Sequence, residues 1–423
     1  MKQFLLPMIA VCATIGVQAQ SYTLEDLELQ FLKNNGELIA NKYNIDIADA
    51  EIVQEKLWPN PTFAIKEVNL WKTYGYEDKH LSLELEQLIE TAKKRKKRIA
   101  IKELSKNTAL FDYEELLREL RKELRSSYIT LARIKQEEVQ LNTMVDLFTT
   151  LSEQYKRQAN LQNVPKAEYF RIQTELIGYQ NELIELENEK FETLAQLQIL
   201  TFNPDITFEQ LVFEMDKIDL SSQVPINLLE LAKAQNIGLR KQENEIEIAN
   251  KTLDLEKAQR VPDLMVGANF DKGSRGTRDV IGVGVAFDIP VFNTNKGNIK
   301  AAKIAVDQEK MNQFVLENNL IQTVRQLENQ LKRLENQLTN WSATNNTEEQ
   351  LKLIENYKKH LQNKQVNLLE FLDFTEAFRE ANKAYLQLDQ AYKTTFQELQ
   401  YIVGKFLRLC LKEYARMRIK SFV

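Results

Sequence analysis

A strict alternation of apolar with small or polar residues runs through residues 281–289, which read IGVGVAFDI. Ile281, Val283 and Val285 fall on one face of a strand there, and the two glycines fall on the other. Residues 264–271 alternate in the same way just before it, across a short glycine-containing loop. The two stretches predict a β-hairpin with strands of about nine or ten residues, which is close to the length that crosses a bilayer as tilted β-structure.

A second alternating stretch reads HLSLELE at residues 80–86, and residues 62–71 would be its partner strand. We therefore expect hairpins at about 62–88 and 264–289. Away from them the pattern is helical. From about Lys93 to Arg157 apolar residues keep helical spacing without a single proline. A helix of that extent is about 100 Å long, which predicts a coiled coil or a helical tunnel rather than a compact globule.

The two halves of the chain repeat one another. At a shift of 201 residues, Asn35 falls on Asn236 and Pro61 on Pro262, and at a shift of 202, Glu168 falls on Glu370. We expect one structural unit, 20–423, made of two repeats at about 20–203 and 226–404, with a linker at 204–225 and a basic tail at 408–423. Each repeat reads helix, hairpin, very long helix, turn, helix.

Composition excludes several classes of protein. The chain has 423 residues, with 56 Lys and Arg against 61 Asp and Glu, so its net charge of −5 argues against a dedicated nucleic-acid binder. Two histidines and two cysteines leave little for a metal site, and no nucleophile–base pair or phosphate loop stands out. We therefore expect no enzyme, no metal site and no cofactor. Residues 1–19 read as a signal peptide, and no later apolar run reaches 18 residues.

Four bilayer-length strands in an exported protein raise a physical problem. In lipid every backbone N–H and C=O must be paired, so an open four-stranded sheet cannot span a membrane. Either the hairpins are soluble, or several protomers contribute four strands each to a closed barrel. A barrel continued by a bundle of long helices is a conduit, and its function would be passage rather than chemistry.

Three segments carry a resemblance to a known family. Residues 57–62, LWPNPT, resemble the PNP segment that leads into the first hairpin of TolC-type outer-membrane efflux proteins. Residues 87–95, QLIETAKKR, resemble the Q-x-I-E-x-G-G-K-R segment of the heavy-metal (CzcC/CusC-like) branch, with Ala92 and Lys93 in place of the two glycines. Residues 285–292, VAFDIPVF, resemble the exit from that family's second hairpin. The departure at Ala92 and Lys93 would stiffen the junction between strand and helix.

The resemblance implies a mainly α fold, a long α-helical barrel or coiled coil with two β-hairpins per chain that form a 12-stranded transmembrane β-barrel in a homotrimer. It also implies an outer-membrane location with the helical part in the periplasm. The implied partners are outer-membrane lipid, a periplasmic adaptor (membrane fusion) protein and an inner-membrane RND-type pump. The implied activity is efflux of small solutes, with heavy-metal cations the favoured cargo.

Acidic residues just beyond the two helix–helix turns are the candidates for a periplasmic gate. In TolC-like channels acids at matching places line the closed entrance, and three-fold symmetry would turn each into a ring of carboxylates that favours cations. The alternative is that they are ordinary exposed acids. The candidates are Glu168, Glu370 and Asp373. The turns themselves are the candidates for adaptor contact, through Arg157, Asn163, Val164, His360, Gln365 and Val366.

A basic cluster follows the first hairpin. Near the membrane surface it would attract lipid headgroups, although a plain solvated helix start is an equal alternative. The cluster consists of Lys93, Lys94, Arg95, Lys96, Lys97 and Arg98.

Other functions stay open at this stage. A structural periplasmic coiled-coil spacer without a pore would explain the long helices but not the two hairpins. Within the channel class, the cargo could be a drug, or a protein in type I export.

Overall fold

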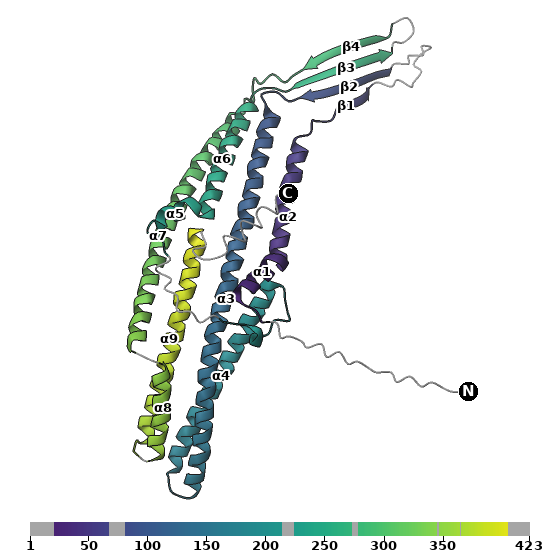
Figure 1. The fold of residues 1–423 in the computed structure, drawn as a ribbon. Helices are drawn as coiled ribbons and strands as arrows, with labels where there is room; N and C mark the ends of the chain where they lie inside the picture. Colours follow the sequence, from purple (N-terminus) through teal and green to yellow (C-terminus); the bar gives the residue numbers. More distant parts are fainter. Residues whose placement is uncertain are drawn as a thin grey trace, which may run out of the picture. The chain divides into compact units, whose positions relative to one another are not determined.

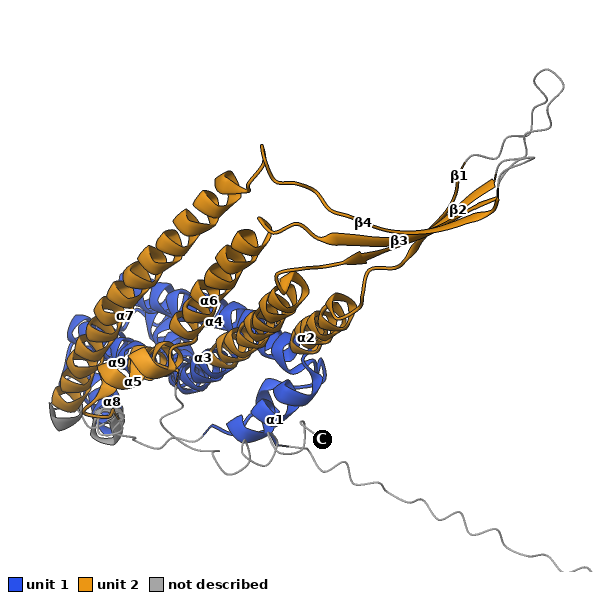
Figure 2. Cartoon of the chain, turned by 90° about the horizontal axis from the view of Figure 1, so that it is seen from above, with its two compact units in different colours: residues 1–35, 124–218, 351–390 blue, residues 36–123, 219–350, 391–423 orange. Residues whose placement is uncertain are grey.

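The computed structural model describes residues 21–66, 81–213, 224–272, 278–344, 347–363 and 365–404. The expected signal peptide and basic tail, His80 and part of the expected linker lie outside the described residues. The chain divides into two compact units (Figure 2). Unit 1 comprises residues 1–35, 124–218 and 351–390, and unit 2 comprises residues 36–123, 219–350 and 391–423.

The order of elements follows the two predicted repeats (Figure 1). The first repeat contains α1 (Leu24–Asn34), α2 (Gly36–Glu55), β1 (Thr62–Lys66), β2 (Leu81–Ile89), α3 (Lys94–Asn160) and α4 (Lys166–Thr201). A short 3₁₀ turn, η1 (Phe208–Gln210), follows. The second repeat contains α5 (Leu228–Gln235), α6 (Ile237–Ala258), β3 (Leu264–Lys272), β4 (Val280–Ala286), α7 (Lys296–Thr344), α8 (Thr347–Gln362) and α9 (Leu368–Val403).

The very long helix is confirmed, since α3 has 67 residues. At a shift of 202, its ends fall on Lys296, where α7 begins, and on Gln362, where α8 ends. The return helices correspond in the same way, because α4 shifted by 202 has the bounds of α9. The long and return helices of the two halves thus have matching bounds at a constant shift.

In unit 2, helices lie side by side in the order α7, α6, α3, α2, and the strands that continue them keep the matching order β4, β3, β2, β1 (Figures 1 and 2). Ion pairs join neighbouring helices, as Lys102 of α3 does with Glu51 of α2 at 2.8 Å, and Lys241 of α6 with Asp112 of α3 at 2.5 Å. An apolar core forms where α5, α6 and α7 meet the end of α9, built on buried residues such as Leu331 and Phe396.

The sheet is antiparallel throughout, in the order β1-β2-β3-β4. Leu85 faces Phe63 on one side and Ala268 on the other, so the register joins the two hairpins along β2 and β3. β4 ends at Ala286 and not at Ile289, where the sequence alternation ends. The reason lies in β3, which begins at Leu264 directly after Pro262 and Asp263, so that beyond the pair of Met265 with Ala286 only one residue of β3 remains.

Unit 1 contains α1, the part of α3 from Leu124, α4, and the residues of α8 and α9 up to Gln390. Its core is aromatic. The ring of Phe148 in α3 lies 5.0 Å from that of Tyr179 in α4 and 6.2 Å from that of Phe371 in α9. Within the described residues, no helix is both long enough and apolar enough to cross a membrane.

Each repeat also contains the same polar contact. The side-chain amide of Asn35 donates to the carbonyl of Leu200 at 2.9 Å in unit 1, and that of Asn236 donates to the carbonyl of Ile402 at 2.8 Å in unit 2. These are equivalent positions at shifts of 201 and 202. Each asparagine thereby satisfies a carbonyl in the last turn of the return helix, a group that has no partner inside the helix.

Candidate functional site

The two turns that join the long helices to the return helices have the same hydrogen bonds. The amide N–H of Asn163 donates to the carbonyl of Gln158 at 2.9 Å, and that of Gln365 donates to the carbonyl of His360 at 2.8 Å. The same pairs also bond through their side chains, with 2.8 Å between Asn163 Nδ2 and Gln158 Oε1, and with His360 Nδ1 against Gln365 Oε1. Three of the adaptor-contact candidates, Asn163, His360 and Gln365, therefore bond within these turns. Val164 and Val366 are next to them, and Arg157 lies in the last turn of α3.

The gate candidates lie in the first turns of the return helices. Glu370 is the third residue of α9, where its amide N–H donates to Asn367 Oδ1 at 2.9 Å and its carboxylate accepts from the Asn367 amide at 3.4 Å. This reciprocal pair is a capping box. Glu168 is the third residue of α4, and a carboxylate at that position is favoured by the helix dipole. Their shared repeat position thus has a local structural reason. Asp373 is exposed and lies about one turn further along α9.

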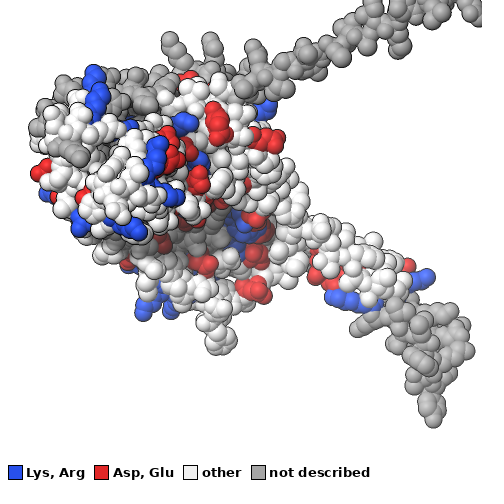
Figure 3. All heavy atoms as spheres, turned by 90° about the horizontal axis from the view of Figure 1, so that it is seen from below, with Lys and Arg blue, Asp and Glu red and all other residues white. Residues whose placement is uncertain are grey.

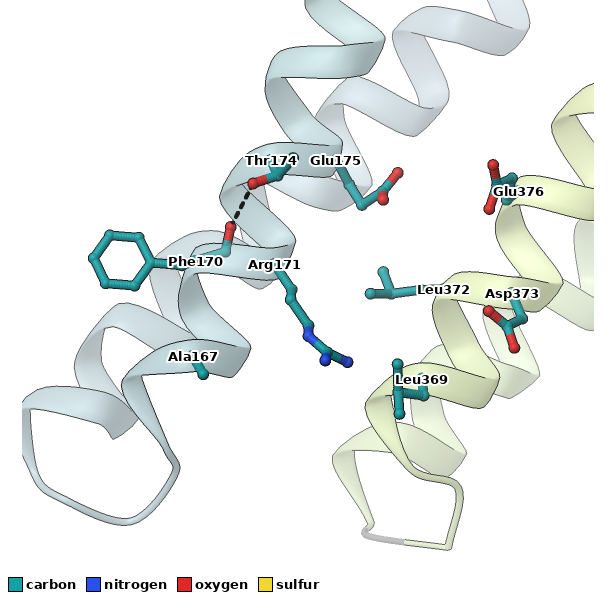
Figure 4. A pocket seen from close by; sticks show the side chains of 9 residues that line it. All are labelled: Ala167, Phe170, Arg171, Thr174, Glu175, Leu369, Leu372, Asp373 and Glu376. Atoms are coloured by element: carbon teal, nitrogen blue, oxygen red, sulfur yellow. Dashed lines mark hydrogen bonds between the residues drawn. The ribbon is translucent and has the colours of Figure 1, made fainter.

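A groove opens between α4 and α9 and begins at these first turns (Figure 4). Figure 4 shows Arg171 pointing from α4 across the groove toward Leu369 and Asp373, whereas Phe170 points away from it. Glu175 lies opposite Glu376. Burial and the nearby carboxylate of Glu376 raise the pKa of Glu175, and Arg379 opposes that rise. The groove combines apolar contact with charges of both signs. It is lined by Ala167, Phe170, Arg171, Thr174, Glu175, Leu369, Leu372, Asp373 and Glu376.

Charged side chains of both signs are interspersed on the face seen in Figure 3, and no large area of that face carries a single sign. Several in unit 1 are held in buried or partly buried pairs. Arg133 bonds Glu137 and contacts Glu189 at 2.5 Å, and its side chain is almost inaccessible. Arg379 donates to Glu182 at 3.0 Å and lies over the ring of Tyr179. Within the described residues, no three or more His, Cys, Asp or Glu side chains are grouped so that they could hold a metal ion.

The junction between strands and helices in unit 2 is closed by a buried ion pair. Lys94, only 3% exposed, contacts Asp263 at 2.8 Å, and the Thr91 amide donates to the same carboxylate at 2.8 Å. Burial raises the pKa of the Asp263 carboxyl, but the hydrogen bonds from Lys94 and Thr91 outweigh it and hold that pKa below its ordinary value. This contact ties the start of α3 to the start of β3, and so the first hairpin to the second.

Other residues of the basic cluster also have partners in the protein. Arg98 donates to both carboxylate oxygens of Glu90, at 2.6 and 2.9 Å. Arg95 lies 3.8 Å from the centre of the Trp58 ring, and Lys97 donates to the carbonyl of Asp254. Lys93 and Lys96 are the members of the cluster that are exposed to solvent.

The backbone explains why this junction suits glycine. Ala92 and Lys93, which replace the family's two glycines, have φ angles of 49° and 59°. In this left-handed region a residue with a Cβ is strained by about 1–2 kcal/mol. The repeat position of Lys93 is Asn295, also left-handed at 56°, and asparagine tolerates that region better than most residues.

We expect Ala92→Gly and Lys93→Gly each to raise the free energy of unfolding by about 0.5–1 kcal/mol, because the relief of left-handed strain exceeds the larger chain entropy of glycine. Thermal unfolding followed by circular dichroism measures it. Ala100→Gly, inside helix α3, is the matched control and should lower stability by a similar amount. Loss of stability in the double-glycine variant would contradict the strain argument.

The two faces of the sheet differ in chemistry. Pairing and alternation place Phe63, Leu85 and Val283 on one face, in line with Ala268. Many side chains there are apolar and exposed, with Val283 at 87%. The opposite face carries the Lys66–Glu84 ion pair and an Asn269–Asp271 hydrogen bond of 2.9 Å. One face is thus suited to lipid and the other to water.

Long paired helices, duplicated in register and continued by a four-stranded sheet with one apolar face, make up the fold of a TolC-like outer-membrane channel protomer. The comparisons agree. Residues 228–405 match the family model described as outer membrane efflux protein. The cobalt-zinc-cadmium resistance protein CzcC of Cupriavidus metallidurans is 22% identical over 299 residues, which cover 70% of each chain.

Solved structures give the same fold. The CmeC outer membrane channel of Campylobacter jejuni superposes with a TM-score of 0.75 at 16% identity, covering 95% of this chain and 90% of that one. CusC gives a TM-score of 0.72 at 13% identity, covering 90% of this chain and 92% of that one. OprN gives 0.76 at 12%, covering 91% and 90%. The chain therefore has the fold of these outer-membrane channels, and its residues 228–405 match the outer membrane efflux protein family.

Proposed function

We propose that this chain forms the homotrimeric exit duct of a tripartite, RND-type efflux system that passes small solutes, and heavy-metal cations first among them, from the periplasm to the exterior. The observation that carries the proposal is the sheet. It exposes an apolar face, and within the described residues its edge strands β1 and β4 lack a ladder partner on their outer side. Since lipid tolerates no open edge, further copies must pair with both edges.

Three copies of four strands give the twelve-stranded barrel that the family resemblance implies. In such a ring β4 of one copy meets β1 of the next, and this pairing is antiparallel, as are all the pairings inside the sheet. The polar face with its Lys66–Glu84 pair then lines the lumen. The solute passes through water along that face without chemical change.

The tip turns and the groove between α4 and α9 are the proposed contact with the periplasmic adaptor. Both turns expose side chains at the ends of long helices, and the groove offers apolar surface beside charges of both signs. A helical partner with an apolar stripe flanked by charges would fit such a groove. The exposed Lys93 and Lys96 are the proposed contacts with lipid headgroups.

Heavy-metal cargo is proposed because the relative CzcC is named for resistance to cobalt, zinc and cadmium. The test is deletion of the gene followed by challenge with these three cations, and in parallel with drugs and dyes. We expect the deletion strain to become sensitive to the metals alone. The gene on a plasmid should restore its tolerance to them. Sensitivity to drugs or dyes with unchanged metal tolerance would move the cargo to organic solutes and leave the duct in place.

The gate is proposed at Glu370 and Asp373, repeated three times around the axis. We expect the double variant Glu370→Gln, Asp373→Asn to raise single-channel conductance and to weaken the preference for cations, because it removes the carboxylates that constrict and charge the entrance. Glutamine can keep the capping box at Glu370, so the helix start is preserved. Glu187→Gln, an exposed acid on α4, is the control. Unchanged conductance and selectivity would remove both residues from the gate.

A further inference from the structure

Two carboxylates face one another across the groove between α4 and α9, where Glu175 lies opposite Glu376 (Figure 4). Glu175 is the tenth residue of α4 and Glu376 the ninth of α9. Both are beyond the first turn, where capping and the helix dipole favour an acid. At a shift of 202, Glu175 falls on Ala377 and Glu376 falls on Thr174, so the internal repeat does not account for the pair either.

The charges around the pair do not neutralise it. Arg379 of α9 donates to Glu182 at 3.0 Å, and its guanidinium lies 3.9 Å from Glu376 and 4.0 Å from Glu380. This cation is therefore shared among several acids. Arg171 of α4 points toward the other end of the groove. The remaining charged or titratable groups along this seam are Asp373 beside Arg171, Tyr179 under Arg379, and Glu137 of α3 with Lys383 in the next cavity.

This environment favours a proton on the pair. Burial, and then the charge of Glu376, raise the pKa of Glu175, and Arg379 opposes them. A carboxyl group whose pKa is raised by folding binds its proton more tightly in the folded protein than in the unfolded chain. The protonated pair therefore adds stability in mild acid, and this stability is lost as the pH rises through the raised pKa. At neutral pH the two carboxylates repel one another.

The groove leaves room for the two helices to move. Its volume is about 550 Å³, and on its wall Leu369 is 53% exposed. On the side of α3 the same helices are held by Phe148, whose buried ring contacts those of Tyr179 and Phe371. A change in the spacing of α4 and α9 can thus occur at the open groove while this aromatic core stays packed.

We propose that Glu175 and Glu376 form a proton-operated latch, which narrows the groove between α4 and α9 in mild acid and widens it at neutral pH. In the narrow state the protonated carboxyl of one acid donates to the carboxylate of the other in a short O–H···O⁻ hydrogen bond. In the wide state the proton has gone to water, and repulsion holds the helices apart. As a control on adaptor docking the latch rests on the proposed function of the groove, whereas the movement itself needs neither adaptor nor trimer.

The distance between the two tips tests the latch. Nitroxide spin labels are placed at Lys166→Cys and Asn363→Cys, exposed positions at the two tip turns and outside the groove, in a full-length chain whose Cys12 and Cys410 are replaced by serine. Labelled chains are diluted with cysteine-free chains, so that each measured pair belongs to one molecule. Double electron–electron resonance gives the distance at about pH 8 and at about pH 5, near the range where carboxyl groups titrate. We expect the distance to be shorter at the lower pH.

Variants of the pair assign the movement. Glu175→Gln keeps the size of the side chain and can donate to Glu376, so it should give the short distance at both pH values. Because Glu376 is exposed and solvent screens the repulsion, we expect the melting temperature of this variant to rise by only about 1 °C at the higher pH and not at the lower one. Glu376→Gln should behave in the same way. Glu185→Gln, an exposed acid further along α4, is the control and should keep the pH dependence.

A distance that does not change with pH would overturn the latch, and so would a change that is equally large in Glu175→Gln. Either result would leave the proposed duct in place, because the duct is tested by conductance. Failure to form a trimer or to conduct would contradict the duct, and would not affect a distance measured within one molecule.

Discussion

Replacing Val283 by arginine should prevent this protein from accumulating in the outer membrane. Val283 is in the middle of β4, on the apolar face of the sheet, and is 87% exposed in the single chain. Arginine on the lipid face of a membrane barrel costs about 2–4 kcal/mol near the bilayer midplane. In a trimer the cost applies three times. Carbonate-washed outer-membrane fractions, probed with an antibody, measure the amount inserted.

The neighbouring residue provides the control. Gly284 is on the opposite face of β4, and a Cβ added there meets no atom of the described structure within 4 Å. Gly284→Arg should therefore insert almost normally, since its guanidinium would lie in the water-filled lumen. Equal loss of both variants would contradict the assignment of the two faces, and equal tolerance would contradict burial of the sheet in lipid.

Replacing Gly404 by alanine should destabilise unit 2 by about 2–4 kcal/mol. Gly404 follows the last residue of α9 with a φ of 77°, where any other side chain is strained. A Cβ there would lie 2.2 Å from the carbonyl oxygen of Gln235 and 2.5 Å from the guanidinium of Arg118. Strain and overlap add, because the backbone of Gln235 cannot move without disturbing α5. Thermal unfolding in detergent measures the loss.

Two matched variants separate this effect from loss of glycine in general. Gly178→Ala lies inside α4, where an added Cβ meets nothing within 4 Å, and should raise stability by about 0.5–1 kcal/mol. Phe202 is the repeat position of Gly404 and also has a left-handed φ, of 52°. Phe202→Gly should change stability by less than about 1 kcal/mol, in the stabilising direction. A neutral Gly404→Ala would disprove the close approach of α9 to α5.

The sequence predicts the fold well because two periodicities in it are unambiguous. Alternation locates β2, β3 and β4, and the proline-free helical pattern locates α3. The repeat then places every element twice. What the alternation misses is the early end of β4, since that depends on where the neighbouring strand β3 begins. A pattern along one strand holds no information about its partner's length.

The site is less predictable from sequence. Glu168 and Glu370 share a repeat position, which suggests a shared gate, but both are also third residues of helices, which is reason enough for an acid there. The left-handed backbone at Ala92, Lys93 and Phe202 is invisible in the sequence because none of these residues is glycine. The pair of Glu175 and Glu376 is equally invisible, because its two acids come from different helices and occupy positions that the repeat does not relate.

Planar-bilayer conductance of detergent-extracted protein of known oligomeric size tests the central claim most directly. The account predicts discrete, cation-selective steps from a trimer, with selectivity that weakens in the Glu370→Gln, Asp373→Asn variant. An elongated oligomer that never inserts and never conducts would contradict it, and would leave a periplasmic helical spacer as the better description of this chain.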